Sequence, residues 1–228
     1  MNPATASASC TRRDFFRGRL NSFSATVAPA RYLGPTSSLP GGVPTVDRTS
    51  GRFPDCVVRG HLDSSYRLVS DLIADQRVMI GLIYTRCEGI CPTTTRNMLA
   101  ARKILEQRGQ APFRMITLSI DPERDTPDDL HRYAAMNTAA QFDNWQFVVA
   151  SPADTLALRR SLRLIDPNPE RDAKLSTHSG VLIFGNDTTN RWGGIPAAAE
   201  PIHIANLFER TVRTTSLQEY AGFGKPSD

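Results

Sequence analysis

The feature that most constrains the fold is a continuous apolar run of seven residues, from Val78 to Tyr84. A strand with one face in water alternates apolar and polar residues, whereas a strand buried on both faces is apolar throughout. The run is also too short to cross a membrane as a helix, which needs about 20 residues. It therefore predicts a buried central strand.

Further apolar runs alternate with segments of helical periodicity along the rest of the chain. This alternation is typical of an α/β fold, with a central mixed β-sheet flanked by helices and an N-terminal β-hairpin extension. The segment 164–176 is polar, contains proline and is expected to be an insertion. Strands are predicted at 56–59, 66–68, 77–84, 113–120, 145–149 and 178–184, with a short partner at 191–192, a helical turn at 69–74, and helices at 92–107, 127–136, 152–162 and 202–212.

Three of the predicted helices begin with a residue followed by proline: Cys91-Pro92, Thr126-Pro127 and Ser151-Pro152. Proline suits the first position of a helix because no hydrogen-bond donor is needed there, and Thr and Ser are good N-caps. By analogy, we expect Cys91 to occupy the cap position of its helix. The positive helix end, helped by Arg86, then favours a thiolate at Cys91.

The net charge of +4 is confined to the first 33 residues, which hold five arginines and one acidic residue. The remainder is balanced, which argues against nucleic acid as a partner. Residues 11–16, with Arg12 and Arg13, resemble a twin-arginine export signal, although the composition also suits an organellar transit peptide or a plain flexible tail. We expect a leader at 1–50, one domain at 51–216 and a C-terminal tail at 217–228.

Cys87 and Cys91 lie four residues apart, in the turn between the buried strand and the helix that follows it. Two thiolates that converge there suit a soft metal ion, and the same pair can close into a disulfide. Four cysteines are too few for a disulfide-rich scaffold of this length. Cys56 is expected to be a packing residue on a short strand, and no role is predicted for Cys10.

A metal ion needs further donors, and histidine is the natural third ligand beside two thiolates. Of the four histidines, His61, His131 and His203 fall at positions typical of surface or structurally satisfied residues. His178 differs because it opens an apolar strand after a polar loop. Such a loop-borne imidazole is placed to swing over the two sulfurs.

Three motifs together resemble the Sco/SenC family: the segment 85–92 around the cysteines, the segment 118–127 with Asp121 and Asp125, and the strand opened by His178. Their order and spacing match over about residues 53–208. The resemblance implies a thioredoxin-like fold and a copper site, Cu(I) or Cu(II), whose ligands are Cys87, Cys91 and His178. It also implies a role in assembling the dinuclear copper centre of cytochrome c oxidase.

Asp121 and Asp125 are expected to cap a helix and to support the site from behind the ligands. The chain departs from the family pattern at Thr177, where members commonly carry an acidic residue, and in showing no membrane anchor. We therefore expect an exported, periplasmic protein without a transmembrane segment, with organellar import as the alternative.

Two functions from different classes remain open. A metallochaperone would carry copper to the copper-receiving subunit of the oxidase or to another copper protein. A thiol–disulfide oxidoreductase would need only the redox pair Cys87 and Cys91, together with a thiol reductant such as a thioredoxin-like protein. A peroxidase-like enzyme needs a single thiolate and fits the paired motif less well, and a binding module without redox chemistry is the remaining alternative.

Overall fold

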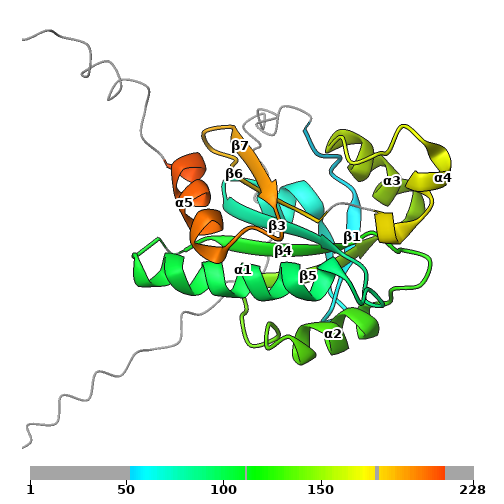
Figure 1. Ribbon diagram of the computed structural model, residues 1–228, viewed down its shortest axis with the longest axis horizontal. Helices are drawn as coiled ribbons and strands as arrows, with labels where there is room; N and C mark the ends of the chain where they lie inside the picture. Colours follow the sequence, from blue (N-terminus) through cyan, green and yellow to red (C-terminus); the bar gives the residue numbers. More distant parts are fainter. Residues whose placement is uncertain (1–51, 111, 178–179, 214–228) are drawn as a thin grey trace, which may run out of the picture. The chain divides into compact units, whose positions relative to one another are not determined.

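The described part of the chain contains a sheet of seven strands in the order β2-β1-β5-β4-β3-β6-β7 (Figure 1). This computed structural model describes residues 52–110, 112–177 and 180–213, all within one compact unit. The predicted leader at 1–50 and the predicted C-terminal tail at 217–228, like His178, therefore lie outside the described residues. The expected α/β class with a mixed sheet is confirmed.

Three parallel strands form the centre of the sheet: β3 (Arg77–Ile83), β4 (Arg114–Ser119) and β5 (Trp145–Ala150). The predicted hairpin, β1 (Val57–Gly60) and β2 (Ser65–Arg67), extends the sheet beyond β5 through antiparallel pairing. On the other side, a second antiparallel hairpin continues it beyond β3. That hairpin consists of β6 (Val181–Asn186) and β7 (Arg191–Pro196).

The helices agree closely with the sequence prediction where polar caps mark their starts. The Thr126 and Ser151 hydroxyls each accept a hydrogen bond from the backbone N–H three residues later, as good N-caps do. The predicted insertion contains two short helical segments of its own. The helices are α1 (Ile90–Gln107), α2 (Pro127–Met136), α3 (Pro152–Ser161), α4 (Pro169–Asp172) and α5 (Pro201–Val212), with a π-helical turn at Leu68–Ile73 and a 3-10 turn at Leu175–Thr177.

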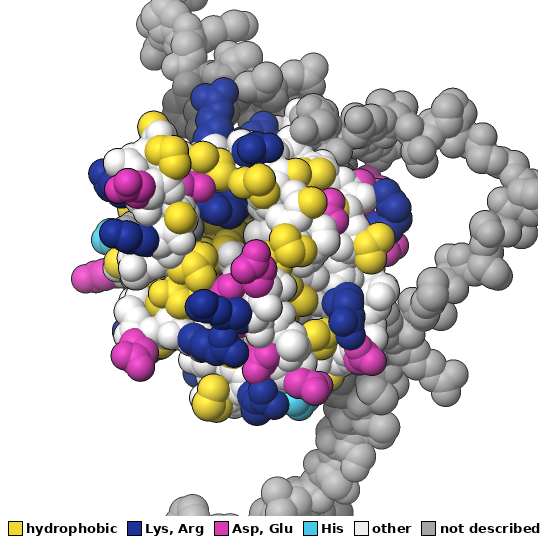
Figure 2. All heavy atoms as spheres, turned by 90° about the vertical axis from the view of Figure 1, so that its right-hand side faces the viewer, with side chains coloured by type: hydrophobic (Ala, Val, Ile, Leu, Met, Phe, Trp, Pro, Cys, Tyr) yellow, Lys and Arg dark blue, Asp and Glu magenta, His cyan; other side chains and the backbone are white. Residues whose placement is uncertain are grey.

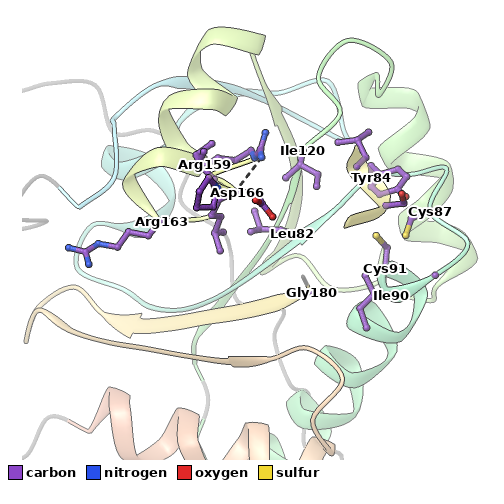
Figure 3. A pocket seen from close by; sticks show the side chains of 16 residues that line it. Leu82, Tyr84, Cys87, Ile90, Cys91, Ile120, Arg159, Arg163, Asp166 and Gly180 are labelled. Atoms are coloured by element: carbon purple, nitrogen blue, oxygen red, sulfur yellow. Dashed lines mark hydrogen bonds between the residues drawn. The ribbon is translucent and has the colours of Figure 1, made fainter. Parts of the chain in front are cut away.

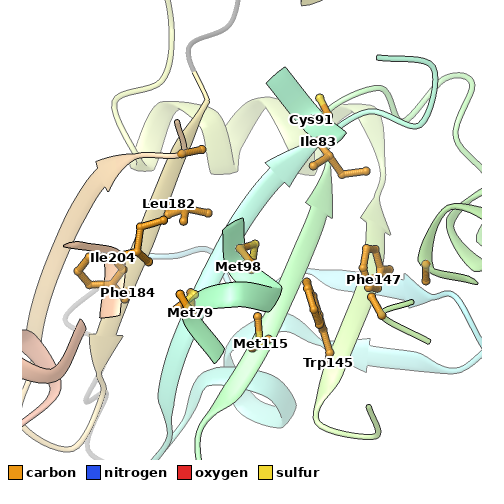
Figure 4. Close-up of a cluster of buried hydrophobic side chains, with 14 of the residues drawn as sticks. Met79, Ile83, Cys91, Met98, Met115, Trp145, Phe147, Leu182, Phe184 and Ile204 are labelled. Carbon is orange, nitrogen blue, oxygen red and sulfur yellow. The ribbon is translucent and has the colours of Figure 1, made fainter. Parts of the chain in front are cut away.

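The central strand β3 is buried because both faces of the sheet are covered. Met79 and Ile83 point into a core that they share with α1, α2 and α5. Val78 and Ile80 point into a second core on the opposite face, with the π-helical turn and α3. Successive side chains of a strand alternate between faces, so a strand with two cores must be apolar throughout. The fully buried aromatic and sulfur-containing side chains of the first core are drawn in Figure 4.

Helix α1 crosses β3 at Gly81, and this contact fixes how closely the helix approaches the sheet. A Cβ atom at Gly81 would lie 2.6 Å from the sulfur of Met98, which is fully buried. Any larger residue at this position would therefore force the Met98 side chain to shift within the packed core. Because α1 also carries Cys91, the contact helps to set where that thiol lies.

We predict that Gly81→Ala destabilises the protein by about 1–3 kcal/mol, the usual cost of an extra methyl group in a packed core. Urea unfolding measures this change. In a Met98→Ala background the new methyl group meets an emptied space, so the same substitution is expected to cost much less. An equal cost in both backgrounds would contradict the contact.

Candidate metal and redox site

The two cysteines lie in the turn that joins β3 to α1, as predicted. The Cys87 N–H donates to the carbonyl of Tyr84 at 3.1 Å, which closes the turn directly after the strand. The expectation that Cys91 caps the helix is wrong, because α1 begins at Ile90 with Gly89 as its N-cap. Cys91 is the second helical residue and Pro92 the third, so its thiol lies inside the first turn.

Because α1 begins at Ile90, the backbone N–H groups of its first turn are available to the sulfur of Cys87. The first N–H groups of a helix have no partner within the helix, and here the N-cap Gly89 has no side chain to serve them. The backbone N–H of Cys91 instead donates to the sulfur of Cys87, as does the N–H of Gly89. The positive end of the helix is thus directed at Cys87.

The pKa values of the two thiols are driven apart. Burial tends to raise the pKa of Cys87, but hydrogen bonds from the Cys91 thiol and N–H, from the Tyr84 hydroxyl and from the Gly89 N–H outweigh it and lower the pKa. Burial and the hydrogen bond to Cys87 raise the pKa of Cys91 to about 12. Thiolate character therefore belongs to Cys87, and the expectation that it resides at Cys91 is corrected by the helix register.

The sulfurs face each other across the turn, and neither is in a disulfide (Figure 3). Cys87 is 8% exposed and Cys91 is 2% exposed. Cys56, by contrast, packs in the core behind the sheet, where burial raises its pKa to about 11. The prediction that Cys56 is a packing residue fits this environment.

Tyr84 is a site residue that the sequence reasoning missed. Its hydroxyl lies beside the sulfur of Cys87 in Figure 3, and a hydrogen bond between them contributes to the lowered pKa of that thiol. Burial and this bond raise the pKa of Tyr84 to about 12, so it remains a donor. Its place in the sequence, three residues before Cys87 and at the end of a buried strand, could have indicated that its side chain lies near the thiols.

Asp125 holds the segment that leads to Cys87. Its carboxylate accepts hydrogen bonds from the Thr85 N–H at 3.0 Å, from the Thr85 hydroxyl at 2.6 Å and from the Ser119 hydroxyl at 2.6 Å. Asp125 thus fixes the backbone two residues before the thiol. Asp121 is buried beside it, and burial followed by the charge of Asp125 raises the pKa of Asp121.

His178 lies outside the described residues, so the third donor is not part of the described geometry. Two residues later, Gly180 lines the same cavity as both cysteines. Among the described residues, no three or more His, Cys, Asp or Glu side chains gather in a way that could hold a metal ion. His61 is structurally satisfied: its Nδ1 accepts the Phe147 N–H at 3.3 Å, and its ring stacks on His131.

The thiols form part of the wall of a cavity of about 580 Å³, which is also lined by the predicted insertion. Figure 2 shows an apolar hollow with basic and acidic side chains around it. Its lining is partly aliphatic and includes Leu82 and Ile120, while Arg159 and Asp166 lie across from the cysteines (Figure 3). The cysteine pair is therefore recessed but open to a small molecule.

Solved structures with the same fold include the following two. Arabidopsis thaliana ScoI with copper bound is similar with a TM-score of 0.58 at 16% identity, over 72% of this chain and 99% of that one. BsSco, described with a disulfide switch and as a member of the Sco family of cytochrome c oxidase assembly proteins, has a TM-score of 0.56 at 22% identity, over 70% and 92% of the two chains. The expected thioredoxin-like fold is confirmed.

A curated relative from Bacillus subtilis, a SCO1 protein homolog, is 35% identical over 108 residues. That match covers 46% of this chain, and the chain spans about half the length of that relative. Among the described residues, no helix is long and apolar enough to cross a membrane.

The SCO1/SenC family model matches residues 66–211, which is more than half of the chain. This range contains the cysteine turn, Asp121 and Asp125, and it ends within the last turn of α5. The resemblance noted in the sequence is confirmed: the chain belongs to the SCO1/SenC family.

Proposed function

We propose that this protein is a copper metallochaperone that binds one copper ion through Cys87, Cys91 and His178. The observation that carries the proposal is the pair of facing, unbonded thiols at the start of α1. Two sulfur donors and an imidazole suit Cu(I), and a further weak ligand would let the set hold Cu(II). Gly180 on the wall of the same cavity supports the assignment of His178, which is two residues away in sequence.

The proposed recipient is the dinuclear copper centre of cytochrome c oxidase, or another copper protein. Family membership supports this recipient. A carrier must release its cargo by ligand exchange, and a site that opens into a cavity gives an incoming donor access to the metal. Export to the periplasm, through the twin-arginine-like segment at Arg12 and Arg13, is part of the same proposal.

A second candidate is a thiol–disulfide oxidoreductase, and the separated pKa values of the two thiols favour it. A low-pKa thiol attacks, and a buried, high-pKa partner resolves the mixed disulfide. The two functions differ in their need for His178, because disulfide exchange requires only Cys87 and Cys91.

We predict one copper per chain in anaerobic titrations with Cu(I) and Cu(II). Cys87→Ser and Cys91→Ser should each abolish tight binding, because each removes one of two sulfur donors. His178→Ala should weaken binding by at least tenfold in competition with a chelator, whereas His203→Ala, which alters an exposed residue of α5, serves as the control. Unchanged stoichiometry and affinity in His178→Ala would refute the ligand assignment.

We predict that Cys87 is alkylated well before Cys91 in the metal-free, reduced protein. The thiolate is the reactive form, and its fraction at Cys87 is raised by the lowered pKa, whereas the pKa of about 12 keeps Cys91 protonated. Iodoacetamide labelling from neutral to strongly alkaline pH, read by peptide mass, tests this order. Labelling of both thiols with one common pH midpoint would contradict it.

We predict that Asp125→Asn lowers copper affinity by about tenfold, because weakening the support of a ligand typically costs 10–100-fold. The asparagine keeps the size of the side chain but loses the charge that accepts from Thr85 and Ser119. Glu123→Gln, on an exposed residue of the same loop, should leave the affinity unchanged. If Asp125→Asn and Glu123→Gln bound copper with equal affinity, Asp125 would have no part in supporting the site.

A further inference from the structure

The cavity beside the thiols is larger than a copper ion needs. Its volume of about 580 Å³ falls in the range of small-molecule pockets, about 300–1,000 Å³. One wall carries Cys87 and Cys91, the lining is partly aliphatic, and the far wall is built by the segment after α3. A redox pair in a pocket of this size points to a small reaction partner.

The far wall is held in place by its own ion pairs. Arg159 is paired with Asp172 and reaches the Leu164 carbonyl. Asp166 is paired with Arg171 at 3.3 Å and accepts the Asn168 N–H. The charges within these two ion pairs cancel, so together they give the far wall no net charge.

Arg163 adds a further positive charge to this wall. It lines the cavity at the end opposite the cysteines, is exposed, and makes no ion pair or side-chain hydrogen bond among the described residues (Figure 3). A ligand that reaches from the thiols to this end would meet sulfur first, then aliphatic side chains, then a guanidinium. Guanidinium groups pair well with carboxylates.

We propose that the cavity binds a low-molecular-mass thiol that carries a carboxylate, and that this thiol reduces the Cys87–Cys91 disulfide. The inference rests on the redox capacity proposed above for the pair. The thiolate of the ligand attacks the sulfur of Cys87, the more exposed of the two, and forms a mixed disulfide there while Cys91 leaves and takes up a proton. A second ligand thiolate then attacks the ligand sulfur of that mixed disulfide, which releases the ligand disulfide and leaves Cys87 reduced.

The backbone at Arg163 permits a clean test. Arg163 has φ 57° and lies just beyond the end of α3, where its N–H bonds to the Arg160 carbonyl and the Leu164 N–H to the Arg159 carbonyl. Glycine is the residue best suited to this helix ending. Arg163→Gly therefore removes the guanidinium while the unfolding midpoint stays unchanged or rises. Arg163→Lys keeps the charge. Arg160→Ala, at an exposed residue of α3 that does not line the cavity, serves as the control.

The second step can be followed on its own by running it in reverse. In full-length Cys91→Ser protein, the Cys87 thiolate attacks glutathione disulfide and releases glutathione, and mass spectrometry follows the mixed disulfide. The probes are glutathione disulfide and its carboxyl-esterified form, which differ in charge but little in size. We expect the unesterified probe to react about threefold to fivefold faster, within the range of an exposed ion pair.

Arg163→Gly should bring the two rates together, Arg163→Lys should keep most of the difference, and Arg160→Ala should keep all of it. Raising the ionic strength to about 1 M, where the Debye length is about 3 Å, should also remove the difference. Equal rates for both probes, or a preference that survives Arg163→Gly, would refute the binding of a carboxylate at Arg163 but would leave the redox role of the cysteines standing. Failure of Cys91→Ser to form a mixed disulfide with either probe would overturn the redox role on which it rests.

Discussion

The chemistry of the site depends on the junction between β3 and α1. β3 is held at the centre of the sheet by parallel pairing with β4 and antiparallel pairing with β6. Gly81 lets α1 approach the strand closely, and Asp125 fixes Thr85 at the end of the strand. With both sides of the turn anchored, the free N–H groups at the start of α1 have a fixed target, the sulfur of Cys87.

This arrangement makes the two thiols unequal, and the inequality serves both proposed functions. A thiolate at Cys87 is ready to bind a soft metal or to attack a disulfide, while the protonated, buried Cys91 must lose its proton to join a copper site or to close a disulfide. Metal binding and disulfide formation therefore compete for the same two sulfurs. Whatever reduces the disulfide restores the copper site, which links the inference about Arg163 to the proposed cargo.

Much of the fold was predictable because its signals are local. The uniform apolar character of β3 follows from its two cores, and the starts of α2 and α3 are marked by Thr126 and Ser151, whose hydroxyls cap the helices. The start of α1 was predicted two residues late because Gly89 caps it without a side chain, so Pro92 was taken for the first position instead of the third. That shift moved the expected thiolate from Cys87 to Cys91.

The site was predictable only in part. The two cysteines lie only four residues apart in one turn, so their spacing in sequence was enough to predict that they lie together. The contacts of Tyr84 and Asp125, and the position of Arg163 across the cavity, depend on how distant segments pack, which no local pattern encodes. His178 was assigned through the family resemblance and remains a prediction.

The central claim is that two sulfurs and one imidazole share a single copper ion. X-ray absorption spectroscopy of the Cu(I)-loaded protein tests it most directly, because it counts the sulfur and nitrogen neighbours of the metal. We predict two sulfur neighbours and one nitrogen neighbour, with the nitrogen lost in His178→Ala and one sulfur lost in Cys91→Ser. A copper environment with no sulfur, or a nitrogen neighbour that persists in His178→Ala, would contradict the account.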